Sequence, residues 1–138
     1  LTDTFFVNRE EAESLTNFGK SQGKEKELLI AVSNLGSKVT IITDGGNGVF
    51  AYNKQVFLKC PTLPVDAYER TGAGDAFGSG CLSALIKGKT IDEALIWGTV
   101  NSASVIGYTG AQKGLLKQED MPVWLERAKS SGVKVEQF

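Results

Sequence analysis

The chain carries near its middle the stretch Glu69-Arg70-Thr71-Gly72-Ala73-Gly74-Asp75-Ala76-Phe77-Gly78-Ser79-Gly80. Gly72 and Gly74 let the backbone turn tightly and leave its N–H groups free of side-chain obstruction. The residues that follow predict a helix over about 74–86, whose free N–H groups and dipole face the same space as the turn. This arrangement suits a transferring phosphoryl group, and a carboxylate at Asp75 can accept a hydroxyl proton there. Taken alone, however, so short a motif is more often a glycine turn with Asp75 as the helix N-cap.

Strand and helix signals alternate on both sides of this stretch. They predict strands at 5–7, 39–43, 49–52, 55–59, 65–68 and 133–138, and helices at 8–18, 24–35, 74–86, 90–107 and 119–130. The alternation predicts an α/β domain with a mainly parallel sheet. In such sheets ligands bind beyond the carboxyl ends of the strands. Because polar or glycine-rich segments follow three of the predicted strands, we expect one site built from residues 8–11, 43–48 and 69–75.

The first two of these segments also have purely structural interpretations. Asn8 and Glu11 have the spacing of a helix N-cap with a carboxylate in the first turn. Residues 43–48, Thr43-Asp44-Gly45-Gly46-Asn47-Gly48, are equally typical of a tight hairpin turn. A structural and a functional role can fall on the same residues, so neither interpretation excludes the other.

Composition removes several classes of function. The 138 residues carry a net charge of −1, without the basic surplus that a nucleic-acid partner favours. The apolar stretches are too short to span a bilayer, and the first residues do not have the pattern of a signal peptide. Histidine is absent, which excludes Ser-His-Asp and Cys-His mechanisms. Cys60 and Cys81 form no C-x-x-C pair, so we expect no structural zinc and a reducing, cytoplasmic setting.

The run Thr71-Gly72-Ala73-Gly74-Asp75-Ala76-Phe77 resembles the C-terminal signature of the ribokinase-like family, also called the phosphofructokinase-B family. There the pattern is D-T-T-G-A-G-D before a helix of small residues, so Glu69 replaces the leading Asp and Arg70 replaces a Thr. Three other segments resemble family motifs in the family's order. They are Asn8-Arg9-Glu10-Glu11 for N-x-x-E, residues 43–48 for T-x-G-x-x-G, and Asn101-Ser102-Ala103-Ser104 with Gly110-Ala111 for A-N-A-A-A and the following G-A.

The resemblance implies a three-layer α/β sandwich of ribokinase type, of which residues 1–138 are the C-terminal, nucleotide-binding and phosphoryl-transfer portion. It implies transfer of the ATP γ-phosphate to a primary hydroxyl of a sugar or related alcohol, with Mg²⁺ and a monovalent cation such as K⁺. The implied roles are Asp75 as base; Gly72, Ala73 and Gly74 as anion hole; Asn8 for phosphate; Glu11 for Mg²⁺ through water; Thr43, Gly45 and Gly48 for the nucleotide loop; Asn101 beside adenine; and Glu69 with the Gly110 loop at the monovalent cation. At the last of these positions Glu69 has one methylene more than the family's Asp.

Two alternatives of function stay open at this point. A nucleoside kinase of the same family shares G-A-G-D, and a nucleotide-binding pseudokinase or regulatory protein would keep the fold without turnover. A dinucleotide-binding domain is disfavoured, because no predicted strand is followed by G-x-G-x-x-G with an acidic residue further on. Nothing in the sequence corresponds to the family's N-terminal, sugar-gripping half, so the acceptor is not identified. We expect the isolated chain to be inactive and to self-associate, as a homodimer or as aggregates, through an exposed sheet edge and apolar surface.

Overall fold

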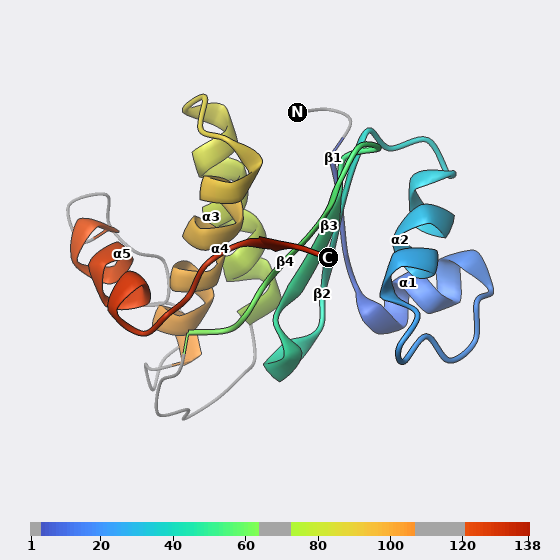
Figure 1. Ribbon diagram of the computed structural model, residues 1–138, viewed down its shortest axis with the longest axis horizontal. Helices are drawn as coiled ribbons and strands as arrows, with labels where there is room; N and C mark the ends of the chain where they lie inside the picture. The colour runs from blue at the N-terminus through green and yellow to red at the C-terminus, as the bar shows by residue number, and fades with distance from the viewer. Residues whose placement is uncertain (1–3, 64–72, 107–120) are drawn as a thin grey trace. The chain divides into compact units, whose positions relative to one another are not determined.

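The computed structural model describes residues 4–63, 73–106 and 121–138, which divide into two compact units (Figure 1). The first unit comprises residues 1–59 and 136–138, and the second comprises residues 60–135. Glu69, Gly72 and the Gly110 loop lie outside the described residues, as does the strand predicted at 65–68.

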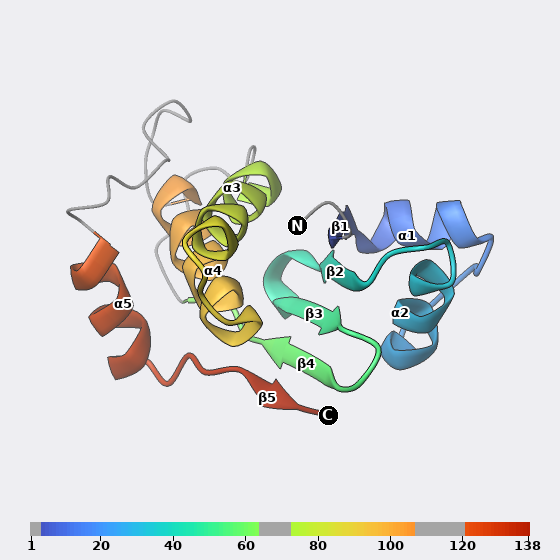
Figure 2. The ribbon, with the colours of Figure 1, turned by 90° about the horizontal axis from the view of Figure 1, so that it is seen from above.

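The first unit is built on a sheet with the strand order β1-β2-β3-β4-β5 (Figure 2). Its elements, in chain order, are β1 (Thr4–Asn8), α1 (Arg9–Thr16), α2 (Glu25–Ser33), β2 (Val39–Thr43), the short 3-10 helix η1 (Gly45–Asn47), β3 (Val49–Tyr52), β4 (Phe57–Cys60) and β5 (Glu136–Gln137). β1 pairs with β2 in parallel, whereas β2/β3 and β4/β5 are antiparallel. The described sheet is therefore mixed, and the prediction of a mainly parallel sheet is corrected to that extent.

The lengths of the connections between strands explain why the sheet contains both parallel and antiparallel pairs. β1 returns to β2 through α1 and α2, and a crossover of that kind gives parallel neighbours. β2 passes to β3 through a turn of a few residues, which forces the chain to reverse. Between β3 and β4 the side-chain oxygen of Asn53 accepts hydrogen bonds from the N–H groups of Gln55 (3.0 Å) and Val56 (2.9 Å), while Lys54 takes a φ of 74°. This turn joins the strands predicted at 49–52 and 55–59.

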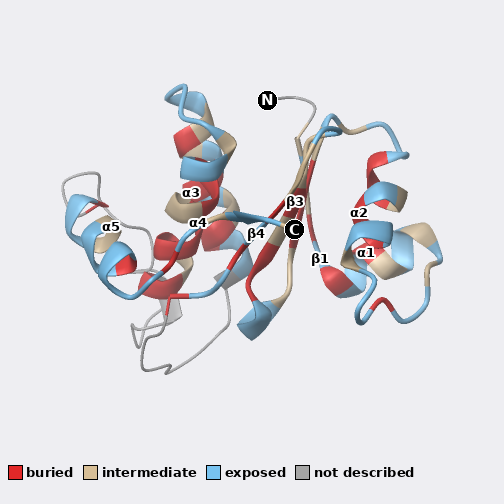
Figure 3. Cartoon of the chain, viewed as in Figure 1, coloured by how far each residue is buried: buried red, intermediate tan, exposed pale blue. Residues whose placement is uncertain are grey.

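The core of the first unit lies where α1 and α2 cover one face of the strands (Figures 1 and 3). It consists of Val7, Ala12, Leu28, Leu29, Val32 and Ile42, all at most 9% exposed. Leu28, Leu29 and Val32 repeat on one face of α2, as helical periodicity requires. Burying each large aliphatic side chain contributes about 1.5–3 kcal/mol, so this face fixes α2 against the sheet.

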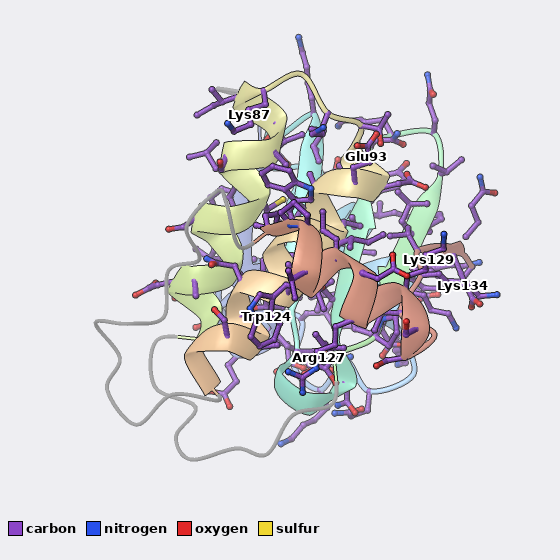
Figure 4. The ribbon with its side chains drawn as sticks, turned by 90° about the vertical axis from the view of Figure 1, so that its left-hand side faces the viewer. Lys87, Glu93, Trp124, Arg127, Lys129 and Lys134 are labelled. Atoms are coloured by element: carbon purple, nitrogen blue, oxygen red, sulfur yellow. The ribbon has the colours of Figure 1, made fainter. Side chains whose placement is uncertain are left out.

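The second unit contains α3 (Ala73–Ile86), α4 (Ile91–Ile106) and α5 (Met121–Ser130). The predicted helices at 74–86 and 90–107 are thus confirmed to within a residue or two. Thr90 caps α4, because its hydroxyl accepts a hydrogen bond from the N–H of Glu93 at 3.2 Å. On α5, the guanidinium of Arg127 lies 4.9 Å from the ring centroid of Trp124 (Figure 4). No helix within the described ranges is long and apolar enough to cross a membrane.

α3 and α4 approach each other closely at two glycines. A Cβ built on Gly80 would lie 2.8 Å from the carbonyl oxygen of Trp97, and one built on Gly98 would lie 2.7 Å from the ring of Phe77. The two helices can approach this closely because neither position carries a side chain. Gly80 on α3 and Gly98 on α4 therefore serve this helix–helix contact.

Candidate functional site

In the first unit, two of the predicted site segments meet at the carboxyl edge of β1 and β2. The parallel register places Asn8, the last residue of β1, directly beside Thr43, the last residue of β2. The chain leaves this edge into α1 on one side and into the turn 44–48 on the other. The expectation that residues 8–11 and 43–48 share an edge is therefore confirmed. The third predicted segment, 69–75, belongs to the second unit and is described only from Ala73 onward.

Asn8 and Glu11 form a complete capping box at the start of α1. The side-chain oxygen of Asn8 accepts from the N–H of Glu11 at 2.7 Å, and Oε1 of Glu11 accepts from the N–H of Asn8 at 2.9 Å. Both side chains are exposed at the edge of the sheet. The structural interpretation of N-x-x-E is thus confirmed, and its consequence is that the Glu11 carboxylate is held in one position.

The turn 44–48 folds back on itself through its own backbone. The N–H of Asp44 donates to the carbonyl of Gly48 at 2.9 Å, and the N–H of Asn47 donates to the carbonyl of Asp44 at 2.9 Å. Gly45 and Gly48 have φ values of +52° and +92°, which residues with a Cβ rarely adopt. Gly45 and Gly46 face open space, because a Cβ built on either meets no atom within 4 Å. The turn therefore presents bare backbone beside Asn8 and Glu11.

A buried guanidinium, which the sequence did not single out, connects this turn to α1 and α2. Arg9 is only 8% exposed, and its Nη2 lies 2.9 Å from Oδ2 of Asp44 and 2.9 Å from Oε2 of Glu25. Burial by itself lowers the pKa of Arg9, but hydrogen bonds and charge attraction from Asp44 and Glu25 outweigh it and raise the pKa above its ordinary value. Its position directly after the N-cap is typical of a solvated residue, and its partners lie far along the chain, so no local signal predicts the contact.

In the second unit, Asp75 lies in the first turn of α3, and both Gly74 and Asp75 are exposed. α3 begins at Ala73, so the predicted helix start is confirmed. The N–H groups of a first helical turn have no partner within the helix and carry the positive end of its dipole. A Cβ on Gly74 would meet nothing within 4 Å, so the backbone there is open to a ligand. The arrangement combines N–H groups that have no partner within the helix with a neighbouring exposed carboxylate.

Asn101 lies within the contact between α3 and α4. It is 4% exposed, and its Nδ2 donates to the carbonyl oxygen of Ala76 at 2.6 Å. Ala76 follows Asp75 in the chain, so Asn101 ties α4 to the turn that carries the candidate base. The proposed role of Asn101 beside adenine stays a prediction.

The candidate metal ligands of the described residues do not form a cluster. Across residues 4–63, 73–106 and 121–138, no group of three or more Cys, Asp or Glu side chains is arranged to hold a metal ion. Glu11 nevertheless suits an indirect role with Mg²⁺, because one of its oxygens is fixed by the capping box on an exposed carboxylate. A hard cation that keeps several waters can be held through such a carboxylate without direct coordination.

Comparisons with known proteins identify relatives of this chain. Residues 1–118 match the family described as pfkB family carbohydrate kinase. The chain is 32% identical over 131 residues to a ribokinase of Haemophilus influenzae, covering 93% of this chain and 42% of that protein. It is 35% identical over 109 residues to an ATP-dependent 6-phosphofructokinase of Thermoanaerobacterium thermosaccharolyticum, covering 79% of this chain and 33% of that protein.

Solved structures also include a ribokinase that is similar to this chain. The crystal structure of a ribokinase from Thermotoga maritima superposes with a TM-score of 0.80 at 32% identity, over 90% of this chain and 42% of the ribokinase. The ribokinase-type α/β fold predicted from the sequence is thereby confirmed. The chain spans less than half the length of these relatives. From the family match over most of its residues and these similarities, the chain belongs to the pfkB family of carbohydrate kinases.

Proposed function

We propose that this chain carries the nucleotide-binding and phosphoryl-transfer portion of a kinase that moves the ATP γ-phosphate to a primary hydroxyl of a sugar or related alcohol. The observation that carries the proposal is the exposed Asp75 in the first turn of α3, directly after the exposed Gly74. Phosphoryl transfer depends mainly on positioning and on stabilising negative charge, and this helix start provides both kinds of group.

Asp75 acts as the base in this proposal. Its carboxylate accepts the proton of the acceptor hydroxyl as the hydroxyl oxygen bonds to the γ-phosphorus and the bond to the ADP oxygen breaks. The N–H groups of Gly72, Ala73 and Gly74 form the anion hole, and those of Ala73 and Gly74 belong to the open start of α3. Their fixed direction lets them stabilise developing charge without reorganisation.

The nucleotide is assigned to the edge of the first unit. Thr43, Gly45 and Gly48 shape its loop, Asn8 approaches the phosphates, and Glu11 holds Mg²⁺ through water. Bound Mg²⁺ would neutralise phosphate charge. A ribokinase II of E. coli with the same fold, at 21% identity, is described in complex with ATP and Mg²⁺. A K⁺ site at Glu69 and the Gly110 loop is kept as part of the proposal, although both lie outside the described residues.

A nucleoside is the second candidate acceptor. The chain is 30% identical over 104 residues to a cytidine kinase of Thermococcus kodakarensis, covering 73% of this chain and 36% of that protein. The base, the anion hole and the nucleotide loop would serve either acceptor, because they act on the hydroxyl and the phosphates alone. A panel of sugars and nucleosides, assayed with the complete gene product, separates the two.

Replacing the base tests the proposed function. In the complete gene product, Asp75→Asn keeps the size of the side chain and removes its basicity, so kcat should fall by at least about 10²-fold. The affinity for ATP should change little. Asp92→Asn is the matched control, because Asp92 is an exposed acid in the first turn of the neighbouring helix α4. Near-normal kcat in Asp75→Asn would rule out Asp75 as the base.

A further inference from the structure

Arg9 uses nearly all of its hydrogen-bonding capacity on three separate segments of the first unit. Nη1 donates to the backbone oxygen of Ser21 at 2.9 Å and to its hydroxyl at 2.8 Å. Nη2 has two hydrogens and two carboxylates within 2.9 Å, Glu25 at the start of α2 and Asp44 at the start of the turn 44–48. The carbon centre of the guanidinium lies 5.7 Å from the ring centroid of Phe50 on β3. The planar fork of arginine therefore fixes four elements relative to one another.

Asp44 transmits this fixation to the glycine-rich turn. Its Oδ2 accepts from Nδ2 of Asn47 at 3.2 Å as well as from Arg9, and its backbone N–H closes the turn on Gly48. The side chain of Asp44 is 14% exposed, so its ion pair with Arg9 is shielded from solvent. A partly buried pair of this kind is screened less by salt than a surface pair.

The guanidinium of Arg9 separates two carboxylates, those of Asp44 and Glu25, and its removal would displace one of them. The oxygens of Asp44 and Glu25 that share Nη2 can be no further apart than twice their 2.9 Å distance from it. Removing the guanidinium would leave two carboxylates facing each other in a half-buried place, where like charges repel strongly. Glu25 is anchored on α2 against the core, whereas Asp44 begins a turn containing three glycines. The turn would therefore be the side that moves.

We propose that Arg9 is a positioning residue for the nucleotide, which holds the glycine-rich turn 44–48 in its binding shape through Asp44. The proposal rests on the proposed function, because it takes that turn to be the nucleotide loop. Arg9 itself is buried among Ser21, Glu25 and Asp44, so in this proposal it acts on the nucleotide only through the turn. Its effect should therefore appear in the affinity for ATP and leave the acceptor and the chemical step almost unchanged.

The test uses the complete gene product with the acceptor that it phosphorylates best. Arg9→Met, which keeps the length of the side chain without the charge, should raise the KM for ATP about tenfold or more, as loss of a charged hydrogen bond implies. The KM for the acceptor and kcat at saturating ATP should stay within about twofold. Arg9→Lys keeps the charge but loses the fork, and it should give an intermediate KM for ATP.

A double-mutant cycle identifies the path of the effect. Asp44→Ala should also raise the KM for ATP about tenfold, and Arg9→Met combined with Asp44→Ala should be no worse than the more severe single change. Glu25→Ala is the matched control, because it removes the other carboxylate from the same nitrogen without touching the turn. It should change the KM for ATP by less than about twofold.

Three results would overturn the proposal. The first is that Arg9→Met raises the KM for ATP and the KM for the acceptor equally, and the second is that the increases in the KM for ATP from Arg9→Met and Asp44→Ala multiply in the double variant. The third is that Glu25→Ala raises the KM for ATP as much as Asp44→Ala does. If Arg9→Met does not fold, Arg9→Lys and the Asp44 and Glu25 variants decide the matter. Calorimetric Kd values for ATP–Mg²⁺ give the same ratios without turnover. Wild-type protein that binds ATP–Mg²⁺ but phosphorylates nothing would refute the kinase proposal alone, and wild-type protein that binds no nucleotide would refute both.

Discussion

Gly80→Ala provides a direct test of how α3 and α4 are packed. The added Cβ would lie 2.8 Å from the carbonyl oxygen of Trp97, 2.9 Å from Cβ of Asn101 and 3.2 Å from Cα of Gly98. None of these atoms is the end of a flexible side chain, so a rotamer change cannot relieve the contact. The two helices would have to move apart.

The expected magnitude is the balance of two terms. Forcing an extra methyl group into a well-packed contact costs about 1–3 kcal/mol. Replacing glycine by alanine inside a helix stabilises the folded state by about 1 kcal/mol, because alanine has the higher helix propensity. Because all three contacts of the new Cβ involve backbone or Cβ atoms, the first term should lie near its upper end. We expect a net loss of about 2 kcal/mol in the free energy of unfolding, measured by urea titration of the complete gene product.

Gly78→Ala is the control on the same helix. A Cβ built on Gly78 meets no atom within 4 Å, so only the gain in helix propensity remains. This variant should be stabilised by up to about 1 kcal/mol. The difference between the two variants, about 3 kcal/mol, then measures the overpacking alone. Equal urea midpoints for Gly78→Ala and Gly80→Ala would refute the description of a close helix–helix contact at Gly80.

Two further predictions concern the isolated chain and its thiols. The isolated 138-residue chain should bind ATP–Mg²⁺ weakly, phosphorylate no sugar or nucleoside at a useful rate, and self-associate. Calorimetry measures the binding, a coupled assay the turnover, and light scattering over a concentration series the association. Robust turnover by a strictly monomeric chain would contradict this prediction. Burial raises the pKa of the Cys81 thiol from 9.0 to about 12, so its stabilising effect is complete below pH 9 and is lost as pH rises toward 12. Urea midpoints between pH 8 and 11 should fall less steeply for Cys81→Ala than for wild type.

Local signals account for what the sequence predicted correctly. The capping box at Asn8 depends on residues three positions apart, and it forms as the spacing indicates. The turn at Asn53 and the start of α3 after Gly72 likewise depend on neighbouring residues. The family resemblance rested on such local motifs, which is why the fold could be predicted from them.

Contacts between distant segments account for what was missed. Arg9 follows a helix cap and its sequence context indicates a solvated side chain, yet it is buried by Ser21, Glu25 and Asp44. Asn101 lies in a helix of small residues, and only the packing of α4 on α3 brings its amide to the carbonyl of Ala76. The alternation of strands and helices predicts a parallel sheet, whereas the short connection between β2 and β3 makes these two strands antiparallel.

The capping box at Asn8 and Glu11 is compatible with the role proposed for Glu11 toward Mg²⁺. In that proposal the cation keeps several of its waters, and the carboxylate that holds them should stay in one position. The bond from the N–H of Asn8 to Oε1 of Glu11 provides that restraint at the edge where β1 meets β2. Arg9, the next residue, restrains the facing turn through Asp44. Consecutive residues of one helix start thus fix both sides of the proposed nucleotide site, and the same interactions that stabilise the unit preorganise it for its ligand.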